Sequence, residues 1–417
     1  MTKTLKIIAI RFTFLLCIIF IVCFNNGSFI FLYPLTKYTD PILQQLVPWT
    51  GQHLLHLSDP VNPNFNGSGD TTYHYVLLFV VFLLALIGTL IWSVIDRKRK
   101  SHDQLFYWLT VSLRFYVGFM LVHYGLAKLN NGQFPGPSAT GMSTTYGDSS
   151  PMGLAWRFLG FSEGYKTFMF FAEMMGILLF FRKTATVGAL LCLMTCLNIM
   201  AINYFFDVPV KLLSTALVIM CLIILFPNFS RLFQFFFKGK TIGLDQMTPP
   251  VFKAKWARIT KVAVKYVAIA ICVGMPAFYT LTAALNKQKE AKESLYGAYR
   301  ISSLKWTNGA PAVDSLYVSK GWKVLGLDNY DRAFIKYGDN ETIYAKAQID
   351  LSAQTMKWSF TETPDVRYTL SFKRLHRDTL ELKGDLLDKP VVISLVRKEF
   401  ELTKRDFRWV NEMPYNR

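Results

Sequence analysis

The sequence predicts a polytopic α-helical membrane protein of about seven spans, followed by a small antiparallel β-barrel-like domain. Three observations lead to this fold class. Apolar runs close to the ~20 residues that a bilayer requires fill most of the chain before Leu285. Lysines and arginines cluster between alternate runs. After Leu285 the pattern changes to short alternating strands that turns separate, which is typical of an antiparallel sheet.

The basic clusters predict an orientation as well as a location. They are Arg97-Lys98-Arg99-Lys100 at the end of one apolar run, Arg182-Lys183 between two more, and Lys253, Lys255, Arg258, Lys261 and Lys265 before the last. Cytoplasmic loops carry an excess of Lys and Arg. We therefore expect a multi-pass protein of the bacterial inner (cytoplasmic) membrane, with a cytoplasmic N-terminus and a periplasmic C-terminal domain.

The net charge of +18 follows from the same asymmetry. Basic residues on the cytoplasmic side face anionic lipid headgroups, so membrane lipids are the expected partners. Nucleic acid is not an expected partner, because the charge distribution is already explained by topology.

The chain is expected to have four parts. Residues 1–104 hold two N-terminal spans with an outer loop, and 105–228 form a four-helix membrane module. Residues 229–285 contain a cytoplasmic amphipathic segment and the last span, and 286–417 form a periplasmic β-rich domain. The predicted spans are about 7–32, 73–95, 105–129, 165–181, 184–206, 208–226 and 263–285.

The C-terminal part is expected to fold as a closed or nearly closed barrel, because that architecture removes exposed sheet edges. The expected strands are 295–301, 322–327, 332–337, 342–350, 355–360, 368–372, 379–382 and 391–396. All of the 6 cysteines lie in the apolar runs, so no disulfide framework is expected in this domain.

Polar residues within or beside the apolar runs predict a ligand-binding pocket. Ionisable groups at membrane depth cost at least a few kcal/mol, so they face one another or a wet cavity. The expected pocket residues are Arg114, Lys128, Glu173, Asn198, Asn203, Asp207 and Lys211. The alternative is that these groups are paired structural charges, with lysines near helix ends extending to the interface.

Three small residues, Gly118, Gly125 and Gly176, should allow the third and fourth spans to approach closely. No metal site is predicted, since His123 has no second histidine well inside any span. The sequence has no P-loop, no G-x-S-x-G and no H-E-x-x-H motif, and no catalytic residue is assigned.

Residues of about 105–226 resemble the DoxX-like family of membrane proteins. The residues that carry the resemblance are Leu113–Gly118, Tyr124–Lys128, Ala172–Leu179 and the polar end of the fifth span, Asn198–Asp207. The resemblance implies a four-helix module and membrane redox work, including quinone-linked thiosulfate oxidation. The opening Tyr296-Gly297-Ala298-Tyr299 and the strand rhythm of the tail are similar to lipocalin-like barrels.

Two functions remain open at this point. The first is a membrane anchor or assembly factor that presents its periplasmic β domain to a periplasmic or membrane protein partner. The second is a redox-linked protein that binds a quinone or isoprenoid-like lipid in the polar pocket. A small-solute transporter is disfavoured, because the unequal spans show no inverted repeat.

Overall fold

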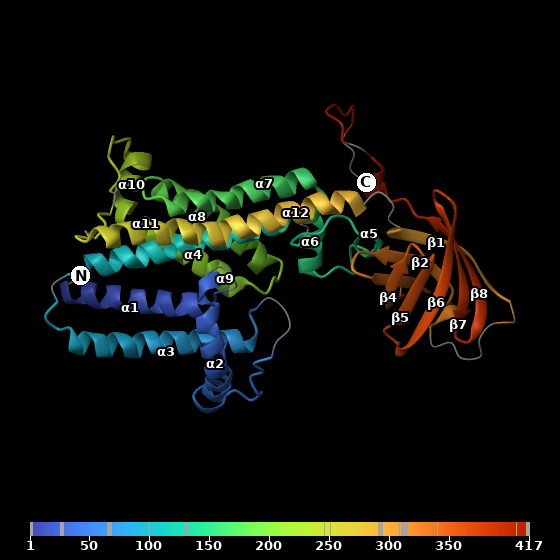
Figure 1. The fold of residues 1–417 in the computed structure, drawn as a ribbon, viewed down its shortest axis with the longest axis horizontal. Coiled ribbons are helices and arrows are strands. Elements are labelled where there is room, and N and C mark those ends of the chain that lie inside the picture. The colour runs from blue at the N-terminus through green and yellow to red at the C-terminus, as the bar shows by residue number, and fades with distance from the viewer. Residues whose placement is uncertain are drawn as a thin grey trace. The chain divides into compact units, whose positions relative to one another are not determined.

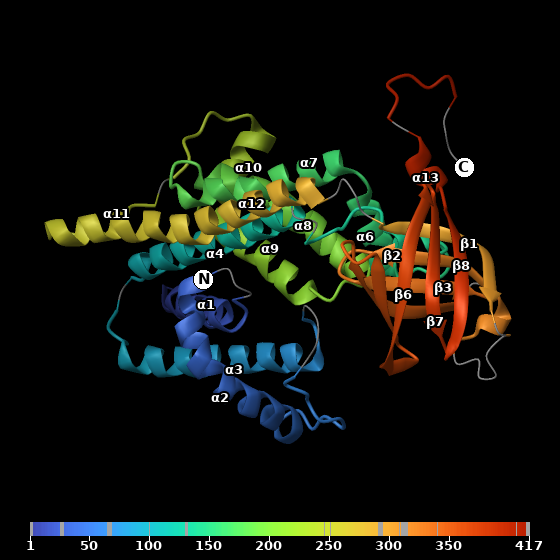
Figure 2. The same cartoon turned by 45° about the vertical axis from the view of Figure 1, so that its right-hand side comes forward.

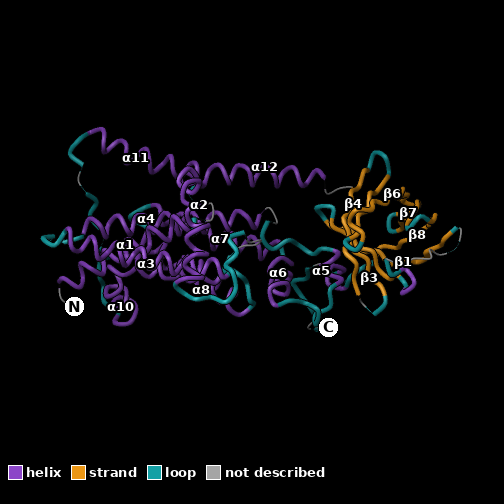
Figure 3. Tube along the Cα trace, turned by 90° about the horizontal axis from the view of Figure 1, so that it is seen from below, coloured by secondary structure: helices purple, strands orange, loops and turns teal. Residues whose placement is uncertain are grey.

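The protein consists of a helical unit and a unit built around a barrel (Figures 1 and 3). The computed structural model describes residues 3–25, 29–64, 69–99, 101–129, 132–245, 247–250, 252–290, 295–307, 309, 316–339, 341–405 and 407–413. Residues 1–134 and 151–287 form the helical unit, and 135–150 and 288–417 form the second unit. Lys100, at the end of the first basic cluster, lies outside the described residues.

Six helices of the described residues are long and apolar enough to cross a membrane, which confirms the multi-pass fold class. The elements of the helical unit are α1 (Lys3–Cys23), η1 (Ile30–Leu32), α2 (Tyr33–His53), α3 (Thr72–Ile95), α4 (Asp103–Leu129), α6 (Pro151–Phe161), α7 (Glu163–Met174), η2 (Met175–Phe180), α8 (Ala185–Phe205), α9 (Lys211–Leu225), η3 (Phe226–Asn228), α10 (Phe229–Lys238), α11 (Lys255–Ile269), a π-helical turn η4 (Ala270–Gly274) and α12 (Met275–Glu290).

Two expectations for the N-terminal part need correction. The first long helix ends at Cys23 rather than near residue 32, and the first part of the expected outer loop, residues 33–53, is not a loop but helix α2. Pro34 stands in the first turn of α2, where its missing N–H costs no hydrogen bond and its fixed φ suits a helix. Figure 2 shows α1 and α3 in the same part of the molecule, with α2 beside them.

The predicted fourth span, 165–181, differs from the other spans in its backbone. It consists of the α-helix α7 followed by the 3₁₀ segment η2, and neither piece alone reaches the length of a membrane span. Both pieces pack against α4, and η2 also packs against α8. The segment is therefore part of the bundle, although it is not one continuous long helix.

Helix α4 lies at the centre of the helical unit. Of its most apolar stretch 67% is buried, a larger share than in any other candidate span of the described residues. Its close approach to η2 depends on Gly118 and Gly176, because a Cβ on Gly176 would lie 3.0 Å from the carbonyl oxygen of Gly118. The expectation that small residues bring these two segments together is confirmed.

The last span contains a π-helical turn that accommodates a proline. Pro276 lies just after the π-helical residues Ala270–Gly274. A proline inside an α-helix lacks an N–H, and its ring clashes with the carbonyl four residues earlier. The wider π-helical turn relieves this clash, so α11 and α12 continue as one span.

The second unit contains a closed antiparallel barrel in which the strands follow chain order and β1 closes against β8. The strands are β1 (Gly297–Trp306), β2 (Trp322–Asp328), β3 (Arg332–Tyr337), β4 (Glu341–Asp350), β5 (Thr355–Phe360), β6 (Thr363–His376), β7 (Thr379–Leu386) and β8 (Lys389–Arg397). The expected strands and their barrel closure are confirmed.

Alternation along the strands fills the barrel interior with apolar side chains. On β3, for example, Ala333, Ile335 and Tyr337 belong to the barrel core, and Trp358 of β5 is 1% exposed within the same core. The intervening residues of β3, Phe334 and Lys336, take the outer face, because successive side chains of a strand point to opposite sides.

Candidate functional site

The predicted pocket residues fall into three separate places within the helical unit. Lys128 and Glu173 form one pair, and Asn203, Asp207 and Lys211 lie where α8 connects to α9. Arg114 lies in a third place, beside a pocket. Asn198 is exposed on α8 and makes no hydrogen bond to any described residue.

The first place is a buried ion pair between α4 and α7. Lys128 Nζ donates to Glu173 Oε2 at 2.6 Å, and the two side chains are 3% and 5% exposed. Lys128 Nζ also donates to Gln133 Oε1 at 3.0 Å and lies 5.4 Å from the centre of the Phe134 ring. Glu173 therefore has Lys128 as its charge partner, and Arg114 is not part of this pair.

Gly125 of α4 lies beside this pair. A Cβ at Gly125 would lie 3.4 Å from the Cβ of Glu173 and 3.6 Å from its Oε2, which are ordinary van der Waals distances, so α4 and α7 are in close contact here. A buried ion pair stabilises a fold weakly, because the desolvation penalty offsets much of the attraction. Removing one partner is costly, since the other charge then stays buried and uncompensated.

The second place is the connection between α8 and α9. Lys211 Nζ donates to Asp207 Oδ1 at 2.8 Å, and Asn203 Nδ2 donates to the Val210 carbonyl at 3.2 Å. The Asp70 carboxylate accepts the backbone N–H groups of Lys211 and of Leu212, the latter at 3.1 Å. Asp70 thus caps the N-terminus of α9, where unpaired N–H groups and the helix dipole favour a negative charge.

The third place is a pocket of about 40 Å³ beside Arg114. Arg114 is 5% exposed, and its Nε donates to the Leu179 carbonyl of η2 at 2.7 Å. Arg182, Thr186 and Asn228 also line the pocket. The pocket exceeds the ~10–15 Å³ that one water molecule requires, so it can hold a small polar group.

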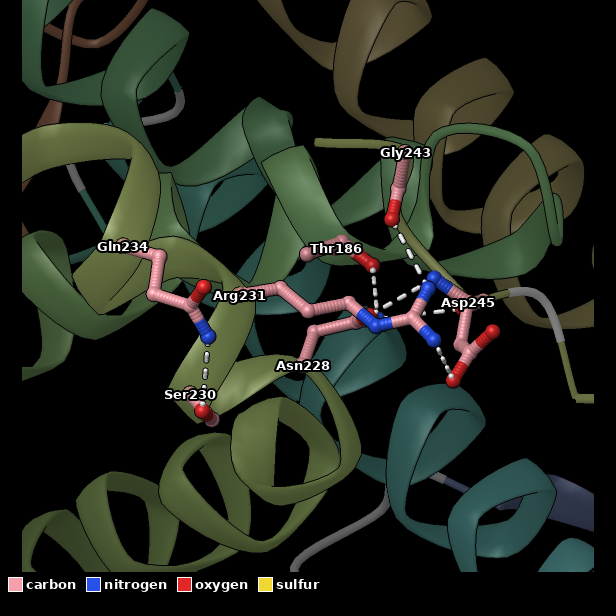
Figure 4. Close-up of polar contacts among 7 residues, drawn as sticks. All are labelled: Thr186, Asn228, Ser230, Arg231, Gln234, Gly243 and Asp245. Atoms are coloured by element: carbon pink, nitrogen blue, oxygen red, sulfur yellow. Dashed lines mark hydrogen bonds and ion pairs between the residues drawn. The ribbon is translucent and has the colours of Figure 1, made fainter. Parts of the chain in front are cut away.

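Three residues that line the pocket, Thr186, Asn228 and Asp245, belong with Arg231 to a network of polar contacts, which we call the polar clamp (Figure 4). Asn228 Nδ2 donates to Thr186 Oγ1 at 3.2 Å and to the Asp245 carbonyl at 3.1 Å, while Asn228 Oδ1 accepts the Asp245 N–H at 2.8 Å. Arg231 pairs with the Asp245 carboxylate at 2.6 Å and donates to the Gly243 carbonyl at 2.8 Å. These contacts hold the segment that follows α10 against α8.

Sequence reasoning missed this clamp, although one signal was present. Asp245 is the single acidic residue of the basic, aromatic stretch 229–261. A lone carboxylate among many cations is a candidate for a specific ion pair, and the structure gives it Arg231.

A further cluster lies in the second unit, where a short helix covers the outer face of the barrel. Helix α5 (Ala139–Ser143) belongs to the loop that connects α4 to α6, and it packs through Ala139 against Ala298 and Phe334. Gly326 leaves room for the Phe334 ring, because a Cβ there would lie 1.9 Å from it. The outward-facing Phe334 is thereby 1% exposed.

Polar contacts hold α5 in this position. The Asp328 carboxylate, at the end of β2, accepts the N–H groups of Ala139 at 2.7 Å and Thr140 at 3.0 Å, and also the Thr140 hydroxyl. Lys336 donates to the Ser143 carbonyl, and burial lowers the pKa of this lysine. The loop 135–150, which falls within the predicted module 105–228, thus packs with the barrel.

Together these elements define a class: a multi-pass membrane protein that carries a closed eight-stranded barrel. The chain is similar to the "Uncharacterized protein YwoB" of Bacillus subtilis (strain 168), with 36% identity over 137 residues, or 33% of this chain and 86% of YwoB. This chain therefore belongs to the same family as YwoB. No family model matches the chain. No solved structure matches it either.

Proposed function

We propose that this protein is a membrane anchor or assembly factor that presents its barrel on the periplasmic side of the bacterial inner membrane. The observation that carries the proposal is the contact between Asp328 of the barrel and α5 of the α4–α6 loop. Two points of the chain lead from the helical unit into the barrel unit, one through this loop and one after α12. An anchor that holds a domain at two points limits the orientations in which the domain meets a partner.

The docked loop also constrains the topology. A folded domain lies on one side of a membrane, so the C-terminal ends of α4 and α12 must both face that side. An even number of crossings must then lie between them. Helices α8, α9 and α11–α12 supply three, and α7 with η2 supplies the fourth.

The dimensions of α7 and η2 allow such a crossing. The 12 residues of α7 and the 6 residues of η2 give about 30 Å at ~1.5 Å per α-helical and ~2.0 Å per 3₁₀ residue. That is the ~30 Å thickness of the hydrocarbon core. The Lys and Arg distribution predicts a cytoplasmic N-terminus, and from that start seven crossings would put the barrel on the periplasmic side.

Reporter fusions test this topology. A periplasm-dependent reporter fused after Arg417 should be active, and the same reporter after Lys100 or after Lys183 should be inactive. The fusion after Lys183 isolates the crossing made by α7 and η2, since without it residue 183 would lie on the same side as the end of α4. Activity after Lys183, or inactivity after Arg417, would refute the proposed arrangement.

The buried Lys128–Glu173 pair favours a second candidate function, a DoxX-like redox role. In that role the pair and the adjoining Gln133 would bind the head group of a quinone or isoprenoid-like lipid. Mass spectrometry of lipids that co-purify with the protein is the test. The redox role predicts that a quinone is enriched with the parent protein and that Glu173→Gln abolishes this enrichment. Asp385→Asn, which changes an exposed residue of the barrel, is the control and should leave the enrichment intact. Absence of quinone enrichment in the parent protein would refute the role.

A further inference from the structure

Cations gather around the Arg114 pocket without matching carboxylates. Arg114 and Arg182 line the pocket, and both lie close enough to Lys265 for their charges to act on it. Lys265 Nζ lies 4.4 Å from the centre of the ring of Phe181, and Phe181 directly precedes Arg182 in the chain. Lys261 Nζ lies 5.9 Å from the ring of Tyr107, which also lines the pocket.

The acidic group at this pocket is already neutralised. Asp245 lines the pocket, but its carboxylate pairs with Arg231 at 2.6 Å. Within the described part of the chain, no carboxylate lies within ion-pair distance of Arg114, Arg182 or Lys265. The pocket therefore carries a net positive charge.

Arg114 is the residue that most requires compensation. It is 5% exposed, and its one hydrogen bond to a described residue runs from Nε to the Leu179 carbonyl. The terminal nitrogens of its guanidinium are left for the pocket that it lines. A buried guanidinium is costly without a counter-charge, and its planar set of N–H donors fits an oxyanion with two parallel hydrogen bonds.

We propose that the Arg114 pocket binds a phosphate group, with Arg114 and Arg182 as its principal ligands. The volume of about 40 Å³ suits such a compact head and excludes the bulk of a lipid, whose chains would lie outside along the helices. The pocket lies at the end of α4 that the Lys and Arg distribution assigns to the cytoplasmic leaflet, where anionic phospholipids are found. This site is separate from the Lys128–Glu173 pair and does not depend on the anchor role.

Native mass spectrometry of the full-length protein with added phosphatidylglycerol or with diacylglycerol, a lipid that has no phosphate, tests the proposal. Phosphatidylglycerol should bind at least 10-fold more tightly. Arg114→Gln should weaken that binding at least 10-fold, and Arg182→Gln about 5-fold, which corresponds to the loss of roughly one basic residue near an anionic lipid. Arg182 lies on an exposed turn, so its replacement tests the site without disturbing the buried core.

Arg97→Gln is the matched control, because Arg97 is an exposed arginine of the same predicted leaflet that does not line the pocket. Calorimetric titration with inorganic phosphate distinguishes the two possible sources of the bound phosphate group, a lipid head group and a soluble phosphate. Phosphate binding with the same dependence on Arg114 and Arg182, but without phosphatidylglycerol binding, would assign a soluble phosphate to the pocket. Equal binding of the two lipids together with no phosphate binding would overturn the proposal. A loss of phosphatidylglycerol binding in Arg97→Gln as large as the loss in Arg182→Gln would also overturn it.

Discussion

Replacing Asp328 with alanine should release α5 from the barrel. In the folded protein, the Asp328 carboxylate accepts the N–H groups of Ala139 and Thr140 at 2.7 and 3.0 Å, together with the Thr140 hydroxyl. The change removes all three acceptor contacts at once. The first-turn N–H groups of α5 have no intrahelical acceptor, so they lose their cap.

The size of the effect follows from these contacts. Hydrogen bonds to a charged group contribute ~1.5–3 kcal/mol each, and loss of a helix cap costs ~0.5–2 kcal/mol. Water partly replaces the lost acceptor, because the loop can move away from the barrel surface. We expect a net cost of about 3 kcal/mol, which corresponds to about a 100-fold shift toward the undocked loop.

Hydrogen exchange of the full-length protein in detergent measures this shift. Protection of the Ala139 and Thr140 amides should fall about 100-fold in Asp328→Ala and by less in Asp328→Asn, which keeps a carbonyl acceptor. Asp385→Ala removes an exposed barrel aspartate and should leave these amides unchanged. Unchanged protection in Asp328→Ala would refute the reasoning that this carboxylate holds the loop.

The remaining predictions concern the bundle and the barrel. Lys128→Met alone, or Glu173→Leu alone, should destabilise the protein by ~3–5 kcal/mol, because the other charge stays buried without a partner. The double variant should be destabilised by much less, as measured by unfolding in mixed micelles. Equal losses in the two single variants that add in the double variant would argue against a buried pair. Gly176→Ala should cost ~1–3 kcal/mol through contact with the Gly118 carbonyl, whereas a Cβ at Gly274 meets nothing within 4 Å, so Gly274→Ala should show no such contact penalty. Hydrogen bonds from the Ser352 hydroxyl and from the Ala353 N–H lower the pKa of Asp350 below its ordinary value of 3.8. The ionised carboxylate should therefore stabilise the β4–β5 turn above pH 3.8, and the turn should loosen as the pH falls through the lowered pKa. Amide exchange in the turn measures this loosening, and Asp350→Asn should remove its pH dependence. The fragment 286–417 should give a β-type circular dichroism spectrum and a cooperative melt that reductant and chelator leave unchanged, and joining the loop 135–150 to it should raise the melting temperature; a disordered spectrum would show that the barrel needs the rest of the chain.

The amino-acid pattern alone determined the two kinds of structure in this chain. Apolar length predicts membrane helices, because a bilayer sets the number of residues that can cross it. Alternation with a period of two predicts strands, and the observed bounds of β3 and β5 agree with the expected 332–337 and 355–360. The expected close approach at Gly176 also followed from composition, because the backbone of a glycine is open to a neighbouring helix.

The tertiary structure decided which residue each buried charged side chain contacts. The sequence placed Arg114, Lys128 and Glu173 in neighbouring spans, but helical rotation and the 3₁₀ segment η2 determined that Lys128 meets Glu173 while Arg114 meets Leu179. Periodicity specifies which face of a helix a side chain occupies and not the depth of its contact on another helix.

The docking of α5 on the barrel likewise required the folded chain. The loop that contains Ala139 and the strand that contains Asp328 are 189 residues apart, and no local pattern connects them. Alternation on β3 predicts that Phe334 points outward, and an outward phenylalanine signals a covering element without identifying it. The sequence by itself determined the elements and their exposed faces, and only the three-dimensional packing decided which faces meet, because contacts between distant segments depend on the whole path of the chain.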